Sequence, residues 1–552
     1  DASDTEAVEY LRRNKPRPDK PLAVMFPAPV NDPFRYAEAS LTLTETDRAF
    51  LVQPARAILL VEKKHRTGAP LDRQLPYPSH TGMPLSENIA PGLDEIGVML
   101  PYSPLHHLLL NAFKKPLVAT SANISGEPVL IDNDDVEKRL HHVCHAFLHH
   151  NRPVQRPADD PVYRTIAGRP RPIRSGRGSS PLEIPLPFTL EKPILAVGAH
   201  MKNTITLAWN NRAVISPHIG EMNSIRSIEV FESTIEDLQK LYGVKAESII
   251  CDAHPGYTTS RWARKQNIPV HTVFHHHAHA SAAYHEYSPG GDDNEVIIFS
   301  WDGVGYGEDG TLWGGEAFIG TPGAWKRRAS MRPFHLPGGD KAGREPWRSA
   351  AAICWETGQD YHTATEQNSL LEQAWMKRIN APQSTSVGRL FDAAATLTGL
   401  RTIASFEGQG PMELEARCHD IVKNHQDDTD DFIRLDLKKI NDIWTADWSP
   451  LISTLLDDKK SIAERAILFH HSMAHTLLQQ AIKLRDEHGT NTVSFSGGVF
   501  QNRFLTERAM KLLQEKDFEI SFPELIPVND AGISFGQVIE HGYLYSDKSR
   551  SS

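Results

Sequence analysis

Short apolar runs that end in polar or glycine-rich turns recur along the chain. Residues 22–26 and 117–119 are such runs in the first third, and residues 194–197, 297–301 and 493–495 are such runs in the remainder. Runs of this length, rich in β-branched residues, are typical of buried strands. Stretches with helix-forming composition lie between them, so the pattern predicts an α/β fold.

A histidine run lies near the middle of this pattern. His275, His276, His277 and His279 are interleaved with and followed by alanines, which predicts the start of a helix, and a strand then ends in Asp302. Because residues four apart share a helix face, His275 and His279 can approach one ion, whereas His276 and His277 cannot join them. Two imidazoles and a carboxylate suit a divalent metal such as zinc or iron. The alternative is a helix start with surface histidines.

The strand pattern repeats in the second part of the chain. Residues 194–216 suggest a strand, a polar turn, a second strand and a further turn at Asn210-Asn211, and residues 296–319 repeat this plan around a glycine-rich turn. Residues 493–502 pass through glycines from a strand into a helix, where backbone amides can bind phosphate. We therefore expect a duplicated fold with a cleft between its halves.

Basic and polar residues also gather in the first part of the chain. Lys15 and Arg17 stand among prolines before a strand, Ser121 and Asn123 follow another strand, and Arg177 lies in a basic glycine loop. Cations held stiffly by prolines suggest an anion clamp, although a solvated basic loop is the alternative. Loops at strand ends are where α/β folds place ligand-binding groups.

Bulk properties narrow the class of protein. The 552 residues predict two to four domains, and a net charge of −10 argues against a general nucleic-acid coat. No apolar run approaches the roughly 20 residues that span a bilayer. The four cysteines lie far apart, which is typical of a reducing compartment, so we expect a cytoplasmic enzyme.

The first part resembles a known family. The pattern Lys-x-Arg-Pro-x-Lys-Pro-Leu, the Thr-Ser-x-Asn sequence and the terminal Arg-Gly loop resemble the YrdC-like domains, which bind ATP and form acyl-adenylates. The resemblance implies that nucleotide and carbamate are held by Lys15, Arg17, Ser121, Asn123 and Arg177. Such domains already have a strand and a glycine-rich turn where this chain begins, so we expect an α/β domain that is incomplete at its N-terminus.

The second part resembles the actin-like/sugar-kinase ATPase fold, and in particular the carbamoyltransferases related to the universal tRNA threonylcarbamoyl-transfer protein. The resemblance lies in the motifs around residues 198–204, 252–257, 388–393, 496–502 and 529–532 and in the histidine pair. It implies four metal ligands, His275, His279, Asp302 and Asp530. It also implies cofactor-binding residues, namely Lys202, Asn203, Thr204, Gly388, Asp392, Gly497, Gly498 and Asn502.

The order of the two parts resembles the HypF family of hydrogenase-maturation carbamoyltransferases. We expect an adenylation domain at 1–180, a proline-rich linker at 181–193 and a two-subdomain carbamoyltransferase domain at 194–545. The acylphosphatase domain and zinc fingers of that family are absent from these residues, so we expect part of a longer protein.

The family resemblance also implies the reaction. ATP with Mg²⁺ and carbamate derived from carbamoyl phosphate would form carbamoyl-adenylate, and the carbamoyl group would pass to the C-terminal cysteine of HypE with the help of one divalent metal, iron or zinc. The alternatives are threonylcarbamoyl-adenylate formation with threonylcarbamoyl transfer to tRNA, another small-molecule carbamoyltransferase, a sugar or acetate kinase, and a chaperone-like binding module. Membrane attachment is not expected, and nucleic acid is an unlikely partner because the chain is acidic overall.

Overall fold

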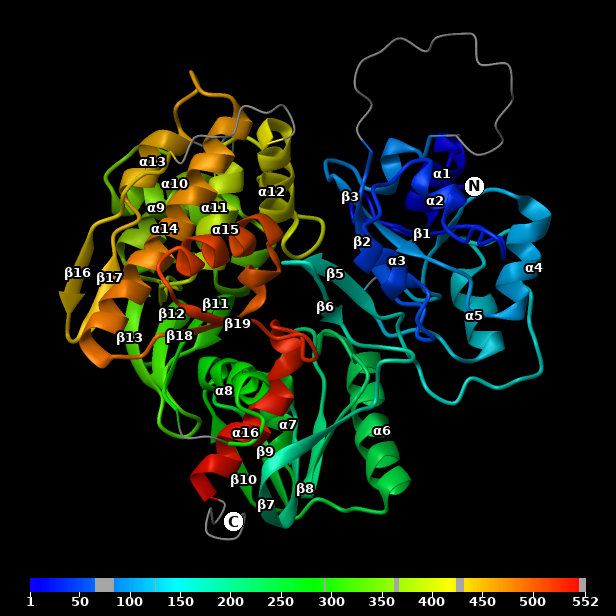
Figure 1. Ribbon diagram of the computed structural model, residues 1–552, viewed down its shortest axis with the longest axis horizontal. Helices are drawn as coiled ribbons and strands as arrows, with labels where there is room; N and C mark the ends of the chain where they lie inside the picture. The colour runs from blue at the N-terminus through cyan, green and yellow to red at the C-terminus, as the bar shows by residue number, and fades with distance from the viewer. Residues whose placement is uncertain (65–83, 125, 292–293, 362–366, 423–430, 546–552) are drawn as a thin grey trace. The chain divides into compact units, whose positions relative to one another are not determined.

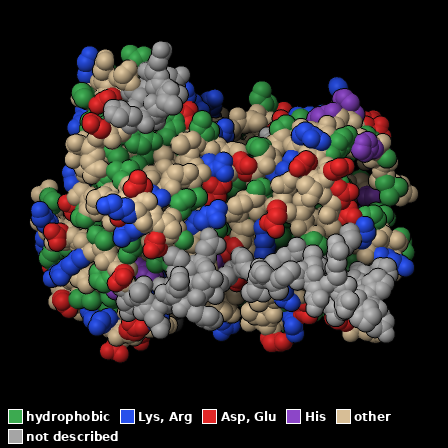
Figure 2. Space-filling model, turned by 90° about the horizontal axis from the view of Figure 1, so that it is seen from above, with side chains coloured by type: hydrophobic (Ala, Val, Ile, Leu, Met, Phe, Trp, Pro, Cys, Tyr) green, Lys and Arg blue, Asp and Glu red, His purple; other side chains and the backbone are tan. Residues whose placement is uncertain are grey.

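The computed structural model describes residues 1–64, 84–124, 126–291, 294–361, 367–422 and 431–545 (Figure 1). The chain separates into two compact units, Asp1–Ser180 and Pro181–Ser552. None of the helices in the described ranges has the length and apolar character needed to cross a lipid bilayer. On the face seen in Figure 2, basic and acidic side chains are interspersed rather than separated into fields of one sign.

The unit Asp1–Ser180 is built on a six-stranded mixed sheet. In spatial order its strands are β4 (Leu117–Ala119), β1 (Ala23–Met25), β3 (Glu95–Met99), β2 (Ile58–Glu62), β5 (Val162–Ile166) and β6 (Arg169–Arg174). The helices described in this unit are α1 (Thr5–Asn14), α2 (Arg35–Glu38), α3 (Glu45–Leu51), α4 (Pro104–Phe113), α5 (Asn133–Leu140) and the 3-10 turn η1 (Glu87–Ile89).

Strand β1 shows how the alternation of side chains builds two cores in this unit. Val24 and the following Phe26 lie on one face of the sheet, in the larger cluster that includes Val8 of α1. Met25 lies on the other face with Leu110 of α4. Both faces of the sheet are therefore covered, as expected of an α/β layer architecture.

The second unit contains two sheets. The first has the order β10 (Val270–Val273), β9 (Ser248–Asp252), β7 (Leu182–Ala196) and β8 (Thr206–Ile215), and its helices are α6 (Ile225–Tyr242), α7 (Thr258–Ala263), α8 (His275–Tyr287) and α16 (Ile533–Tyr545). Helix α6 covers one face with Phe231, Ile235 and Leu238. Residues of α8 and α16 cover the other face.

The second sheet has the order β16 (Leu437–Ile440), β17 (Ile443–Ala446), β13 (Lys326–Met331), β12 (Leu312–Gly320), β11 (Val296–Tyr306), β18 (Thr492–Ser496) and β19 (Glu519–Ser521), with β14 (Phe334–His335) and β15 (Gln383–Ser384) beside β12. The helices that follow these strands are α9 (Trp347–Glu356), α10 (Gln367–Met376), α11 (Val387–Leu397), α12 (Gln409–Val422), α13 (Pro450–Leu455), α14 (Ile462–His488) and α15 (Arg503–Gln514), with the 3-10 turns η2 (Gly339–Gly343), η3 (Gly498–Gln501) and η4 (Asp530–Gly532).

The two sheets share one plan. Strand β7 pairs antiparallel with β8 and parallel with β9, and β11 pairs antiparallel with β12 and parallel with β18. In Figure 1 helices α8 and α16 lie together beside the strands of the first sheet. Helix α8 also packs on β11 and β18 of the second sheet, so it joins the two halves. The predicted mixed α/β fold with a duplicated second part is confirmed.

Helices α8 and α16 approach each other closely. A Cβ atom added to Gly536 of α16 would lie 1.8 Å from the carbonyl oxygen of Ala278 in α8. Only a residue without a side chain fits at this crossing, and the alanines of α8 keep the opposite surface small. The histidine run is thereby held against the C-terminal helix of the chain.

The segment that we expected to be a linker, residues 181–193, forms most of strand β7. Ile184, Leu186 and Phe188 are buried in the core between this sheet and α16, while the alternate positions include the prolines. The pairing of β7 with β8 shifts register between Pro185 and Leu190. Prolines are tolerated in a strand at such irregular positions, which explains why the proline content suggested a linker.

One other local prediction differs from the structure. The turn expected at Asn210-Asn211 lies inside the continuous strand β8, where Asn210 has a φ of 49° opposite a register shift. Asparagine accepts a left-handed backbone conformation more readily than most residues, so it marks an irregular strand here rather than a turn.

Candidate functional site

Four acidic and imidazole side chains meet in the second unit. His275 and His279 come from α8, Asp302 from β11 and Asp530 from η4, and one ligand atom of each lies within 4.8 Å of the others. Both histidines and Asp302 are buried, and the Asp530 side chain is 13% exposed. Residues 255 positions apart in sequence are therefore brought to one point by the packing of α8 between the two sheets.

The ring nitrogens that face this point have no partner of their own. His275 Nε2 lies 3.4 Å from Asp302 Oδ2 and 3.8 Å from Asp530 Oδ1, and His279 Nε2 lies 3.7 Å and 3.8 Å from the same atoms. Neither Nε2 atom has a hydrogen-bond partner. Two buried imidazole nitrogens without partners, facing two carboxylates, fit a divalent metal ion with nitrogen and oxygen ligands.

The other ring nitrogens are held by the protein. His275 Nδ1 lies 2.8 Å from Asp252 Oδ2 and His279 Nδ1 lies 3.2 Å from Ser496 Oγ. The amide of Gly498 donates a 3.0 Å hydrogen bond to Asp302 Oδ1. Assigning the proton to Nδ1 leaves each Nε2 lone pair directed at the cluster, as is usual for a metal-binding histidine whose other ring nitrogen donates to the protein.

The pKa shifts of the cluster residues agree with the binding of a cation. Burial, and then the neighbouring Asp302 carboxylate, raise the pKa of Asp530 to about 7. Burial lowers the pKa of His279. Burial also opposes the charged form of His275, but the carboxylates of Asp252 and Asp302 prevail and raise its pKa. Two carboxylates this close repel each other, and a bound cation relieves that repulsion.

The remaining histidines of the run contact neighbouring aromatic side chains. The His276 ring lies 6.2 Å from the Trp313 ring, and the His277 ring packs edge-on against Phe318 at 5.4 Å. Both are buried, and burial lowers their pKa values, that of His277 to about 4. They serve as neutral packing residues, so the helix geometry selects only the pair four residues apart.

Lys202 lies near the cluster in the turn between β7 and β8. Its Nζ is 2.6 Å from Glu407 Oε2 of the α11–α12 connection. Burial alone would lower the pKa of Lys202, but the carboxylates of Glu407, Asp530 and Asp302 prevail and raise it. A lysine that faces three carboxylates is fully charged and presents a cation at the edge of the metal cluster.

The side chains of the two residues after Lys202 bond to backbone carbonyls of the protein. Asn203 Nδ2 donates to the carbonyl oxygens of Val197 and Ala199, at 2.9 and 2.8 Å. Thr204 Oγ1 donates to the carbonyl of Ala531, next to Asp530, at 2.8 Å. Both side chains are buried, so they brace the turn and the loop that carries Asp530, and within this motif Lys202 is the residue whose charged group faces the cluster.

The glycines predicted to contact nucleotide allow close backbone packing. Added Cβ atoms would lie 2.9 Å from the Asp302 carbonyl at Gly388 and 2.1 Å from the Trp301 carbonyl at Gly497, where φ is 94°. The amide of Gly498 is already bonded to Asp302. These glycines therefore set the position of β11 and its Asp302, and a phosphate would have to use other amides.

Two further residues predicted to bind cofactor also have protein partners. Asp392 pairs with Arg389 at 2.8 Å, and burial raises the Asp392 pKa to about 6. Asn502 caps α15 by accepting a 2.9 Å bond from the Leu505 amide, and its Nδ2 donates to His470 Nε2 at 2.9 Å. The Asp392–Arg389 pair lies within α11, whereas Asn502 caps α15 and joins it to His470 of α14.

In the unit Asp1–Ser180, Lys15 is enclosed by the loop after β4. Its Nζ donates to Thr120 Oγ1 and Asn123 Oδ1, both at 3.1 Å, and to the Ser121 carbonyl. Arg17 donates to the same Thr120 hydroxyl at 3.0 Å. Burial, and then the charge of Arg17, lower the pKa of Lys15 to about 8. Two cations lie side by side here, an arrangement that suits an anion.

Arg177 lies in a different setting. It donates to Asp160 Oδ1 at 3.0 Å and to the Ala55 carbonyl at 3.1 Å, and its guanidinium lies 3.5 Å from the centre of the Tyr102 ring. Arg174 donates to the Asp160 carbonyl at 2.8 Å. Burial, and then the charges of Arg12 and Arg174, lower the pKa of Arg17. Arg174 therefore extends the cationic group.

Sequence reasoning missed three residues at these sites: Arg174, Asp252 and Glu407. Arg174 stands in the same basic glycine loop as Arg177, and Asp252 stands in the 252–257 motif, so both had a local signal. Glu407 had none, because its relation to Lys202 depends on the packing of two distant loops.

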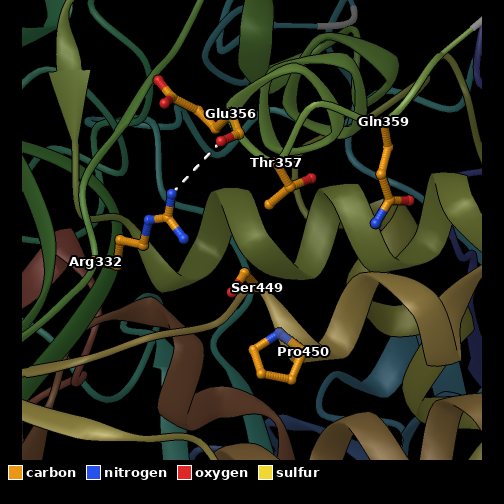
Figure 3. Close-up of a pocket in the computed structure, with 6 residues that line it drawn as sticks. All are labelled: Arg332, Glu356, Thr357, Gln359, Ser449 and Pro450. Atoms are coloured by element: carbon orange, nitrogen blue, oxygen red, sulfur yellow. Dashed lines mark hydrogen bonds between the residues drawn. The ribbon is translucent and has the colours of Figure 1, made fainter.

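Another concavity lies elsewhere in the second unit. A cavity of about 470 Å³ is lined by Arg332, Glu356, Thr357, Gln359, Ser449 and Pro450. Figure 3 shows Arg332 directed at the Glu356 carbonyl, and Arg332 also pairs with Asp447 at 3.0 Å. No residue of the metal cluster or of the predicted cofactor set lines it, so this cavity is separate from the candidate site.

Comparisons with known proteins decide the family. The model described as "HypF Kae1-like domain" matches residues 189–286, the model "Carbamoyltransferase, Kae1-like Domain, second subdomain" matches residues 298–537, and a Sua5/YciO/YrdC model described as "Telomere recombination" matches residues 1–176. Carbamoyltransferase HypF of Synechocystis sp. is 38% identical over 98% of this chain and 69% of its own length. The chain belongs to the HypF family of carbamoyltransferases.

Other HypF proteins agree in sequence and structure. Carbamoyltransferase HypF of Rhizobium leguminosarum bv. viciae is 35% identical over 97% of this chain and 68% of its own length. The crystal structure of a full-length HypF in its phosphate- and nucleotide-bound form matches with a TM-score of 0.88 and 31% identity, over 98% of this chain and 82% of that one. The family predicted from the sequence is confirmed, and with it the class of enzyme.

Proposed function

We propose that this chain carries out two consecutive reactions of [NiFe]-hydrogenase maturation in the cytoplasm, carbamoyl-adenylate formation and carbamoyl transfer. Residues 1–180 would form carbamoyl-adenylate from ATP, with Mg²⁺, and carbamate derived from carbamoyl phosphate. Residues 194–545 would transfer the carbamoyl group to the C-terminal cysteine thiol of HypE. The convergence of His275, His279, Asp302 and Asp530 in the HypF-type unit is the observation that carries the proposal.

In the first reaction a carbamate oxygen attacks the α-phosphorus of ATP. The bond from that phosphorus to the oxygen that bridges to the β-phosphate breaks, and pyrophosphate is released. Negative charge develops on the phosphoryl oxygens as this happens. Lys15 and Arg17, joined through the Thr120 hydroxyl, supply two adjacent positive charges. Preorganised cations of this kind stabilise the transition state without reorganisation. Ser121, Asn123 and Arg177 would shape the site around nucleotide and carbamate.

In the second reaction the thiolate of the acceptor attacks the carbamoyl carbon, and the bond from that carbon to the phosphate oxygen breaks, so that AMP leaves. A divalent iron or zinc ion held by the four ligands would supply Lewis-acid polarisation of the carbamoyl oxygen or anchorage of the adenylate phosphate. Lys202 lies at the edge of this cluster and would pair with the phosphate of the adenylate.

Pyrophosphate exchange with ATP tests the proposal. Because the chain spans about two thirds of the length of its curated relatives, carbamate is supplied directly as well as carbamoyl phosphate. Exchange that depends on either compound, and carbamoyl transfer to HypE under the same conditions, are the expected results. Exchange that instead requires threonine and bicarbonate would contradict the proposal and favour threonylcarbamoyl transfer.

A further inference from the structure

Asp252 ends strand β9 beneath the metal cluster, and its side chain is fully buried. One carboxylate oxygen, Oδ2, lies 2.8 Å from His275 Nδ1. The other, Oδ1, accepts a 2.8 Å hydrogen bond from the backbone amide of His254. The two oxygens of one carboxylate therefore hold two different parts of the unit.

The bond to His275 sets the direction of the ring. With its proton on Nδ1 and directed at Asp252, the His275 ring presents the Nε2 lone pair to Asp302 and Asp530. A carboxylate partner also makes the imidazole a stronger electron donor. The Nδ1 atom of His279 has a serine hydroxyl as its partner instead of a carboxylate, so the hydrogen bonds that hold the two histidine rings are unequal.

The bond to His254 holds a turn that carries aromatic rings. The Gly256 amide donates to His254 Nδ1 at 3.0 Å, and the His254 ring stacks on Tyr257 with centroids 4.2 Å apart. The His200 ring also stacks with Tyr257, with the ring centroids 5.5 Å apart. The edge of His254 meets Tyr306, at the end of the strand that supplies Asp302. The 253–257 turn thus borders the cluster.

We propose that Asp252 is a positioning residue for carbamoyl transfer, which orients His275 toward the metal and at the same time fixes the 253–257 turn. Metal binding and the order of the turn then depend on one side chain. Asparagine at this position has only one acceptor oxygen, so either the Nδ1 proton of His275 or the His254 amide loses its acceptor. The inference rests on the proposed metal site.

The experiment compares wild type with the variants Asp252→Asn and Ser496→Ala. Co²⁺ is titrated into each protein and followed by its visible absorption, and amide hydrogen exchange is measured for the peptide that contains residues 253–257. Asp252→Asn is expected to weaken Co²⁺ binding about 10- to 100-fold and to speed exchange in the turn. Ser496→Ala, which removes the partner of His279, is expected to weaken Co²⁺ binding without changing exchange in the turn.

Wild-type affinity for Co²⁺ in Asp252→Asn would overturn the orienting role, and unchanged exchange of the turn would overturn the coupling. If Asp252→Asn does not fold, exchange of the His254 amide is measured in wild type with and without Co²⁺, and the ion is expected to slow it. No effect of Co²⁺ there contradicts the coupling. A wild-type protein that does not bind Co²⁺ contradicts the proposed metal site itself, so the two failures are distinguishable.

Discussion

Lys202 Nζ lies 2.6 Å from Glu407 Oε2, and this ion pair joins the two halves of the carbamoyltransferase unit beside the metal cluster. Lys202 belongs to the β7–β8 turn of the first half, and Glu407 to the α11–α12 connection of the second. The two side chains are 27% and 46% exposed, so the pair contributes little to global stability. Its importance is local, because it holds a lysine where an anionic substrate would bind.

The pair predicts opposite effects of two substitutions on nucleotide affinity. Lys202→Gln is expected to weaken AMP binding to the second unit about 10-fold or more, because a charge-assisted contact with the phosphate is lost. Glu407→Gln is expected to leave AMP binding equal or tighter, because Lys202 no longer has a competing carboxylate. Calorimetric titration with AMP measures both.

Lys192→Gln is the matched control for these variants. Lys192 forms a 3.6 Å pair with Glu247 at the surface, where the two side chains are 71% and 55% exposed. Its AMP affinity should equal that of wild type. An unchanged affinity in Lys202→Gln would show that Lys202 does not meet the phosphate.

The metal cluster predicts a separation of the two reactions. His279→Ala is expected to lose bound metal and carbamoyl transfer, and to keep pyrophosphate exchange, since the adenylation residues belong to the other unit. Elemental analysis and the two assays check this. His277→Gln is the comparison on the same helix, because His277 packs on Phe318 and not on the cluster. Metal content near wild type in His279→Ala would remove His279 from the ligand set.

The pKa of Lys15 predicts a pH dependence of the first reaction. Burial, and then the charge of Arg17, lower this pKa to about 8, so Lys15 is charged below pH 8 and neutral well above it. The KM for ATP in the exchange assay is therefore expected to rise as the pH increases through about 8, since one of two adjacent cations is lost. Lys15→Met should show weak ATP binding without this inflection. The same inflection in Lys15→Met would assign it to another group.

The crossing of α8 and α16 predicts a strong effect of a single methyl group. Gly536→Ala places a Cβ atom 1.8 Å from the Ala278 carbonyl, so the two helices must separate and the histidine pair must move. A destabilisation of about 1–3 kcal/mol or more is expected from such overpacking, together with weaker metal binding. Chemical denaturation and metal titration measure the two effects.

Gly290→Ala serves as the control for that helix crossing. A Cβ atom at Gly290 has nothing within 4 Å, and the residue is exposed. Its stability should stay within about 0.5 kcal/mol of wild type, as for most surface substitutions. Equal stability of Gly536→Ala and Gly290→Ala would show that the helix crossing tolerates a side chain.

The sequence by itself determined the local features of this protein. Helix periodicity separates His275 and His279 from the two histidines between them, because residues four apart lie on one face. The apolar runs located the strands, and the spaced motifs indicated the HypF family. Each of these inferences depends on residues close together in the chain or on the order of motifs.

Only the tertiary structure decided which partners those residues have. Asp252 and Glu407 reach their places through strand pairing and the packing of distant loops, which local pattern does not encode. The amide of Gly498 and the side chain of Asn203 were assigned to ligands from their motifs, yet they bond within the protein. The proline-rich segment forms strand β7 because its alternate apolar residues pack into a hydrophobic core. The amino-acid sequence shows which polar groups the chain carries. The packing of the fold decides which of those groups can bind a ligand.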